Sequence, residues 1–298
     1  MKHGGARTHP NRVWLYTLIG AMQFFWTANF LVGKFALREF PALLLAGLRV
    51  IVAAVCILPF YLWKVHGRGA WTRHDLPILF GLGLIGVGVN QVFFILGLSR
   101  TSVAHSAFII AMTPIWVLLI AGARGLERPT ARRLAGMLAA FTGVAVLGLE
   151  RKGGPGPTIT GDLMTLGAGS AFALYTVLGK EVNHRYGALT VNMFLFGSGA
   201  VFLLPIVIWQ GWSFPFARVS TAGWLALVYM GVFPSLICYL IFYHALGYVA
   251  ASRLSMLAYV QPVAATLFSV LLLGDRISAP LVVGGAVIFA GVYLAERA

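Results

Sequence analysis

The sequence predicts an all-α polytopic membrane protein with ten transmembrane helices, arranged as two inverted five-helix repeats. Apolar residues make up 59% of the 298 residues, whereas Asp, Glu, Lys and Arg together make up 10%, against about 25% charged residues in an ordinary soluble domain. So few charges cannot cover the surface of a soluble protein of this length, which leaves lipid as the solvent for most of the chain. Ten apolar segments and an internal repeat support the rest of this prediction.

Polar or Gly/Pro-rich interruptions separate apolar segments of about the length that a bilayer-spanning helix requires, roughly 20 residues. The first segment follows Lys2, Arg7 and Arg12 but is too long for the apolar region of a signal peptide, which favours an uncleaved first helix. The fifth segment barely reaches across the hydrocarbon core, and we expect it to be tilted or sunk among its neighbours. The expected spans are 13–33, 42–62, 76–98, 103–122, 134–149, 162–179, 190–209, 223–245, 252–273 and 279–295.

The chain carries 22 Lys and Arg residues against 8 Asp and Glu. The basic residues are scattered between the apolar runs and form no basic face, which argues against nucleic acid as a partner. The excess is explained by a bias of cytoplasmic loops: with both termini in the cytoplasm, 14 Lys and Arg residues fall in cytoplasmic segments, 7 fall in external segments, and Arg49 lies within a span. The two cysteines, Cys56 and Cys238, lie inside apolar runs and are expected to behave as small hydrophobic residues.

An internal repeat emerges when the sequence is compared with itself. A shift of 148 residues aligns Gly83 with Gly231 and Pro114 with Pro262, and a shift of 146 aligns Gly33-Lys34 with Gly179-Lys180. Apolar spans match by chance, whereas coincident Pro and Gly positions do not, so we interpret the halves as copies of one unit. The expected organisation is a first five-helix repeat at 1–149, an external linker at 150–161 and a second five-helix repeat at 162–298.

An odd number of spans in each repeat places the second repeat upside down relative to the first. Loop charges agree, because the first-half loops at 64–73 and 124–133 are basic, whereas their counterparts at 210–222 and 274–278 have one basic residue each. Inverted repeats are typical of secondary transporters, which bind substrate near the middle of the membrane between the repeats. The alternative is a gene duplication that produced only a stable helical bundle.

Several features resemble the drug/metabolite transporter superfamily, and within it the EamA family. They are the ten spans, the two repeats, the pattern Trp26…Asn29…Gly33-Lys34, Arg49 in the second span, and Pro114…Glu127 with its echo Pro262…Asp275. The aromatic-rich spans are most similar to bacterial amino-acid exporters of the YddG kind. The resemblance implies a multi-pass exporter of small metabolites in the bacterial cytoplasmic (inner) membrane, with a central cavity bounded mainly by spans 1, 3, 4, 6, 8 and 9.

Acidic residues all fall at the ends of spans or in loops, and none lies in the middle of a span. A multidrug pump that neutralises cationic drugs with a buried carboxylate is therefore not expected, nor is a carboxylate-based proton relay. Movement of the substrate down its own gradient fits better. His105, near the outer start of span 4, and His244, near the inner end of span 8, are the alternative proton carriers, against the commoner role of a neutral histidine bonded to a neighbouring helix.

Basic residues inside the membrane are few. Arg49 lies about seven residues into its span, and a bond to backbone carbonyls and a role as an anion contact in the cavity are evenly matched for it. Lys34 is a second candidate anion contact, although reaching towards the membrane interface is the more frequent role for a lysine that closes a span. One or two cations are too few for a phosphate site, which requires a clamp of several.

Polar uncharged and aromatic side chains are the other candidates for substrate contacts. Amide groups offer both donors and acceptors, and ring faces bind an ammonium or an apolar side chain. The alternatives are bonds between helices for the amides and packing against lipid or core for the rings. The candidates are Asn29, Asn90, Gln91 and Gln261 among the amides, and Trp26, Trp116, Tyr175, Tyr239 and Tyr259 among the aromatic residues.

Prolines and glycines predict how the spans bend and pack. Pro114, Pro234 and Pro262 should kink spans 4, 8 and 9 and are candidate hinges. Gly136 and Gly143, with their repeat equivalents, place small residues on one face of spans 5 and 10, which we interpret as a closely packed pair outside the cavity.

The predicted function is export of small zwitterionic metabolites, with neutral or aromatic amino acids as the favoured substrates, by alternating access between the two repeats. Other metabolites or drugs of nucleobase, sugar-phosphate or multidrug type are the alternatives. A membrane-embedded enzyme is disfavoured, because Ser170 and Ser198 have no nucleophile-elbow pattern around them. No metal site or cofactor is predicted, and the oligomeric state is left open.

Overall fold

The computed structural model describes residues 11–64, 71–125, 130–150, 157–248 and 260–296, which form helices and connecting turns with no strand among them. In the first half, each predicted span corresponds to one helix or to a series of helical segments. Spans 1 and 2 are α1 (Arg12–Ala36) and α2 (Ala42–Lys64). Span 3 consists of η1 (Arg73–Asp75), α3 (Leu76–Gly83), η2 (Leu84–Val89) and α4 (Asn90–Arg100). Span 4 is α5 (Val103–Ile110) and α6 (Thr113–Ala123), and span 5 is α7 (Ala131–Leu147), which the short η3 (Gly148–Glu150) follows.

The second half follows the same plan. Spans 6 and 7 are α8 (Ile159–Tyr186) and α9 (Ala188–Ser213), and η4 (Phe216–Arg218) leads into span 8. Span 8 consists of α10 (Thr221–Met230), η5 (Gly231–Ile237) and α11 (Cys238–Leu246). Spans 9 and 10 are α13 (Val260–Leu273) and α14 (Ala279–Glu296), and the predicted start of span 9 lies outside the described residues. Among the described residues, six helices are long and apolar enough to cross a membrane, and α13 and α14 are shorter apolar helices.

Helix ends are set by local capping. The side chains of Asn11, Ser102 and Thr130 accept hydrogen bonds from the first turns of α1, α5 and α7, which satisfies N–H groups that have no partner inside the helix. Pro114 stands in the first turn of α6, directly after the break that separates α5 from α6. A proline there removes no hydrogen bond that the helix needs. Span 4 is therefore interrupted in its middle, as its proline predicted.

Spans 3 and 8 both contain a π-helical segment, and the two segments are related by the repeat. The 148-residue shift places η2 (Leu84–Val89) on residues 232–237, which are nearly all of η5 (Gly231–Ile237). η2 directly follows a glycine and η5 begins with one, and each glycine lies close to a helix of the other repeat. A β-carbon on Gly83 would overlap Ser198 Oγ, and one on Gly231 would lie 2.6 Å from Val52 Cγ1. No pattern in the sequence predicts these π-helical segments, and such segments are frequent at functional sites.

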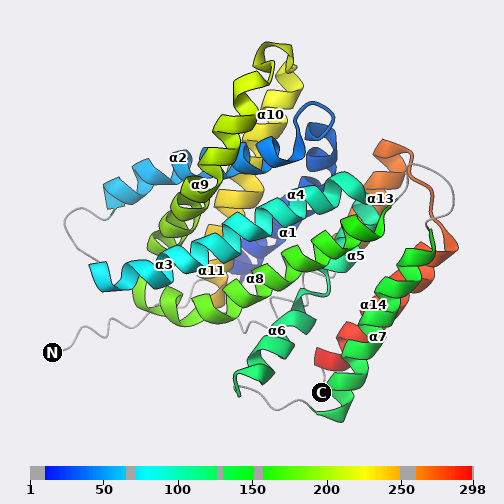
Figure 1. Cartoon of the computed structure of the whole chain (residues 1–298). Coiled ribbons are helices and arrows are strands. Elements are labelled where there is room, and N and C mark those ends of the chain that lie inside the picture. Colours follow the sequence, from blue (N-terminus) through cyan, green and yellow to red (C-terminus); the bar gives the residue numbers. More distant parts are fainter. Residues whose placement is uncertain (1–10, 65–70, 126–129, 151–156, 249–259, 297–298) are drawn as a thin grey trace.

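Contacts between helices follow the repeat as well. α2 contacts its equivalent α9, and α7 contacts its equivalent α14. α1 contacts α10, α11 and α13, while its equivalent α8 contacts η2, α4, α5 and α6. Figure 1 shows α7 and α14 side by side at one edge, away from α2 and α9. The two repeats therefore interlock, and the space between α1 and α8 is bounded by both.

The α7–α14 pair is held together by glycines. A β-carbon on Gly143 would lie 2.7 Å from the carbonyl oxygen of Gly284, and one on Gly291 would overlap the backbone nitrogen of Ala140. The two backbones touch where the sequence places small residues at seven-residue spacing. This contact is the close packing expected for spans 5 and 10.

Candidate functional site

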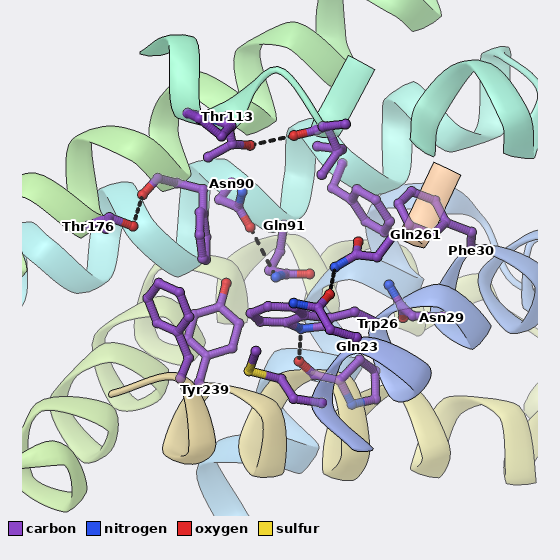
Figure 2. A pocket seen from close by; sticks show the side chains of 18 of the residues that line it. Gln23, Trp26, Asn29, Phe30, Asn90, Gln91, Thr113, Thr176, Tyr239 and Gln261 are labelled. Carbon is purple, nitrogen blue, oxygen red and sulfur yellow. Dashed lines mark hydrogen bonds between the residues drawn. The ribbon is translucent and has the colours of Figure 1, made fainter. Parts of the chain in front are cut away.

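A cavity lies between the two repeats, near the middle of the bundle (Figure 2). Its volume is about 140 Å³, and because one water needs roughly 10–15 Å³, it has room for a molecule of roughly ten non-hydrogen atoms. The first repeat contributes α1, α2, α4, α5 and α6 to the walls, and the second contributes α8, η5, α11 and α13. The polar residues that line the cavity are Gln23, Asn29, Arg49, Asn90, Gln91, Thr113, Thr176 and Gln261.

Aromatic rings form one wall. The ring of Trp26 meets the rings of Phe172 and Tyr239 edge to face, with centroids 6.2 and 6.4 Å apart. Phe242 lies 5.9 Å from the same indole. The indole Nε1 donates to the carbonyl oxygen of Pro234 in η5 at 2.9 Å, which fixes the ring between the two repeats. Such edge-to-face geometry leaves ring faces for an apolar or cationic ligand group.

Amide side chains form a second group around the cavity, and Figure 2 shows them near the indole of Trp26. Asn90 Nδ2 donates to the carbonyl oxygen of Ala168 at 2.8 Å, and Asn90 Oδ1 accepts from Gln91 Nε2 at 3.1 Å. Gln261 on α13 donates to Gln23 on α1, which joins the repeats. Among the described residues, the oxygens Asn29 Oδ1 and Gln91 Oε1 are buried without a hydrogen-bond partner. Two acceptors are therefore available beside the cavity.

Arg49 is buried to 99% and lines the same cavity from α2. Its Nη2 donates to Ser235 Oγ at 3.0 Å and to the carbonyl oxygen of Met230 at 3.3 Å. Within the described part of the chain, Nε and Nη1 are buried without a partner. Arg49 is thus bonded to a backbone carbonyl and also lines the cavity, and its role as an anion contact stays a prediction.

Some predicted contact residues lie away from the cavity. Tyr175 is fully buried, because α8 presents Phe172 and Thr176 to the cavity and turns Tyr175 towards Gly86 and Tyr243. Trp116 meets the ring of Phe141, with centroids 5.5 Å apart. Two further candidates cannot be placed in the lining: Pro262 is buried in the first turn of α13, and Tyr259 lies outside the described residues. Pro114 and Pro234, in contrast, both line the cavity.

Lys34 and His105 belong to a buried polar network beside the end of α4, not to the cavity lining. Lys34 Nζ donates to the carbonyl oxygens of Leu98 and Thr101 at 2.7 and 2.6 Å. The hydroxyl of Thr101 donates to Asp162 Oδ1 at 2.6 Å, and His105 Nδ1 lies 3.4 Å from both carboxylate oxygens of Asp162. His244 is exposed and its ring contacts that of Tyr248, 5.1 Å away. The network joins α1, α5 and α8.

Several residues that line the cavity are not among those predicted from the sequence. Gln23 and Phe30 lie three residues before and four residues after Trp26, so they share its helical face, and this spacing was the signal that could have identified them. Phe172 is the repeat equivalent of Trp26 under the 146-residue shift. The missed lining residues are Met22, Gln23, Phe30, Phe94, Ile110, Ala111, Thr113, Val117, Phe172, Thr176 and Phe242.

Comparison with known proteins matches this architecture to transporters. The EamA-like transporter family matches residues 13–149 and again 159–296. An uncharacterized transporter of Archaeoglobus fulgidus is 26% identical over 283 residues, which cover 94% of this chain and 96% of that protein. The uncharacterized transporter YetK of Bacillus subtilis is 23% identical, covering 99% of this chain and 90% of that protein.

A third relative has a more specific name. The probable terminal-alkyne amino-acid exporter of Streptantibioticus cattleyicolor is 29% identical over 223 residues, which cover 75% of this chain and 74% of that protein. One solved crystal structure shares the fold, with a TM-score of 0.67 and 20% identity over 96% of this chain and 97% of that chain. Since the family matches both halves of the sequence, the chain is a polytopic membrane protein that belongs to the EamA-like transporter family.

Proposed function

We propose that this transporter exports neutral amino acids, preferentially those with apolar or aromatic side chains, across the cytoplasmic membrane of a bacterium. The observation that carries the proposal is the composition of the cavity. Its described lining combines aromatic rings, amide groups and one cation, Arg49, without a carboxylate. A zwitterion carries one positive and one negative group, so it needs few charged partners from the protein. A substrate with a further charged group would leave that group without a partner in a desolvated site.

The name of one relative supports this substrate class. The Streptantibioticus cattleyicolor relative is a probable exporter of a terminal-alkyne amino acid, whose side chain is uncharged. An uncharged side chain would fit against Trp26, Phe172 and Phe242 and lose little free energy on leaving water. The amino-acid backbone would then lie among the amide groups and Arg49. The concentration gradient of the substrate, with the rocking of one repeat against the other, would suffice to move the substrate across the membrane.

The same lining disfavours the alternative substrates. Sugar phosphates carry two negative charges and require several cations or backbone donors, and the described lining has one cation. Cationic drugs require a buried carboxylate, which the described lining lacks. A hydrolytic enzyme is disfavoured because the two candidate nucleophiles bond to their own helices, Ser170 to the carbonyl of Gly167 and Ser198 to that of Phe194.

Counterflow in proteoliposomes tests the proposal. Vesicles loaded with unlabelled phenylalanine, leucine, alanine, aspartate, glucose 6-phosphate or tetraphenylphosphonium would be diluted into the corresponding labelled compound, with protein-free vesicles as the control. We expect accumulation of labelled phenylalanine and leucine, slower exchange of alanine, and none of the charged compounds above control. Exchange of glucose 6-phosphate or tetraphenylphosphonium without exchange of any amino acid would overturn the proposal.

A further inference from the structure

Arg49 is a buried cation that has no carboxylate partner among the described residues. The residue is seven positions after the start of α2, about 10 Å along the helix, and it is 1% exposed. The described ion pairs join His105 to Asp162 and Arg185 to Asp75, and neither involves Arg49. A buried guanidinium without a counter-ion is costly in a membrane. The cavity is where such a counter-ion can be delivered, because Arg49 lines it.

The π-helical segment η5 holds this guanidinium in place. Ser235 Oγ donates to the carbonyl oxygen of Met230 at 2.8 Å, and Arg49 Nη2 donates to both of these oxygens. One nitrogen of the guanidinium is thus fixed to the second repeat, while Nε and Nη1 stay without a partner among the described residues. The N–H groups on those two nitrogens are a preorganised donor set, and a donor set that is already oriented loses little entropy on binding an anion.

The repeat shows that this cation is a feature of one half alone. Under the 146-residue shift the equivalent of Arg49 on α9 is Leu195, and under the 148-residue shift the equivalent of Ser235 on η2 is Val87. The equivalent contact between α9 and η2 therefore has neither the cation nor its anchor, although η2 and η5 have the same π-helical form. A purely structural tie between an α-helix and a π-helical segment does not need an arginine, since the α9–η2 contact forms without one.

We infer that Arg49 binds the carboxylate of the transported amino acid and thereby sets the requirement for a carboxylate. This inference deepens the proposed function and rests on it. The carboxylate accepts hydrogen bonds from Arg49, the ammonium lies near the free oxygens of Asn29 and Gln91, and the side chain lies against the rings around Trp26. Ser235 acts as a positioning residue, because it bonds to Arg49 and does not itself line the cavity.

Three analogues of one size separate the two charged groups of the substrate. Phenylalanine carries both groups, phenylalaninamide lacks the carboxylate, and 3-phenylpropionate lacks the ammonium. Each would compete against counterflow of labelled phenylalanine by the wild type, Arg49→Gln, Arg49→Lys, Ser235→Ala and Lys64→Gln. Lys64 is the matched control, since it is an exposed cation at the end of the same helix. Thermal unfolding in detergent would show which variants fold.

In the wild type we expect 3-phenylpropionate to compete and phenylalaninamide to compete at least ten-fold more weakly than phenylalanine. In Arg49→Gln the apparent affinity for phenylalanine should fall about ten- to a hundred-fold. The ratio of the apparent affinities for phenylalanine and phenylalaninamide should then shrink to about two-fold. Arg49→Lys should keep part of the preference for phenylalanine over phenylalaninamide. Ser235→Ala should weaken the affinity for phenylalanine a few-fold, and Lys64→Gln should match the wild type. If Arg49→Gln does not fold, Arg49→Lys and Ser235→Ala test the inference, because both should reduce the preference for phenylalanine over phenylalaninamide.

Two results would overturn the inference while leaving amino-acid transport intact. One is equal competition by phenylalanine and phenylalaninamide in the wild type. The other is an undiminished preference for phenylalanine over its amide in the folded Arg49 and Ser235 variants. Failure of the proposed function gives a different pattern: the wild type would exchange 3-phenylpropionate but no amino acid, which would leave Arg49 as a carboxylate contact for another substrate class.

Discussion

Glu39 caps the N-terminus of a helix in the opposite repeat. Its Oε2 accepts from the backbone N–H of Ser220 at 2.7 Å, and its Oε1 accepts from the Ser220 hydroxyl at 2.5 Å. Glu39 follows α1, and Ser220 is the N-cap of α10. A carboxylate at this position also interacts favourably with the positive end of the helix dipole. The contact joins the two repeats at the end of the bundle where α2 begins.

The repeat places a different contact at the other end of α2. Arg185 is the equivalent of Glu39 under the 146-residue shift, and Thr72 is the equivalent of Ser220 under the 148-residue shift. Arg185 Nη1 lies 3.9 Å from Asp75 Oδ1, whose Oδ2 accepts from the N–H and hydroxyl of Thr72. Arg185 is largely exposed. The tighter contact therefore lies at the Glu39 end, and alternating access would require it to open.

Glu39→Ala should loosen the contact at that end. The variant removes both acceptors of Ser220, and because the site is partly exposed, we expect a loss of about 1 kcal/mol. Glu39→Gln keeps one acceptor oxygen and should lose less, while the adjacent Arg38→Ala is the control. Thermal unfolding in detergent measures the effect. Equal melting temperatures for Glu39→Ala and the wild type would show that the contact does not stabilise this arrangement.

The glycine contact between α7 and α14 predicts a steep steric penalty. Gly291→Val would place side-chain atoms against the backbone of Ala140, and overpacking of this kind costs about 1–3 kcal/mol or more. Gly81→Val is a matched control, because no atom lies within 4 Å of a β-carbon there. We expect a lower melting temperature for Gly291→Val than for Gly81→Val. Similar values for the two variants would contradict the close packing of the two helices.

Transport should not depend on an imposed proton gradient. No carboxylate is among the described residues that line the cavity, and His105 is fully buried beside Asp162, away from that lining. Phenylalanine counterflow with and without a proton ionophore should differ by less than about two-fold, and His244→Ala should behave as the wild type because His244 is exposed. A strict requirement for a pH gradient that His105→Ala abolishes would make the His105–Asp162 pair a coupling site.

Both termini are expected on the cytoplasmic side, with the linker at 150–161 outside. Single cysteines at Arg12, Arg124 and Thr158, in a background without Cys56 and Cys238, would be labelled with an impermeant maleimide in intact cells. Thr158 should react from outside, whereas Arg12 and Arg124 should react only after the membrane is permeabilised. Reaction of Arg12 and Thr158 from the same side would exclude the inverted five-plus-five topology.

Much of the fold could be predicted from one sequence because bilayer thickness and backbone hydrogen bonding leave few choices. The apolar run 42–62 predicts α2, and the spacing of Gly136 and Gly143 predicts the close contact between α7 and α14. The π-helical segments were not predictable. They lie at tertiary contacts, such as that of Gly231 with Val52, which no local pattern encodes.

The candidate site was harder to predict than the spans, since the face that lines a cavity depends on the rotation of each helix. Tyr175 and Phe172 are three residues apart on α8, and a small rotation decides which of them lines the cavity. His105 and Asp162 illustrate a second limit. They are 57 residues apart in sequence, and only the packing of α5 against α8 brings them together.

The central claim is that this cavity binds amino acids. It is tested most directly by measuring phenylalanine binding to a variant in which an added side chain fills the cavity. Thr176→Trp places an indole into the cavity from α8, and Leu204→Trp places one on the exposed face of α9 as the control. Isothermal titration of phenylalanine into the purified proteins should show binding by the wild type and Leu204→Trp, and none by folded Thr176→Trp. Equal phenylalanine binding by all three proteins, or by none of them, would contradict the assignment of this cavity as an amino-acid site.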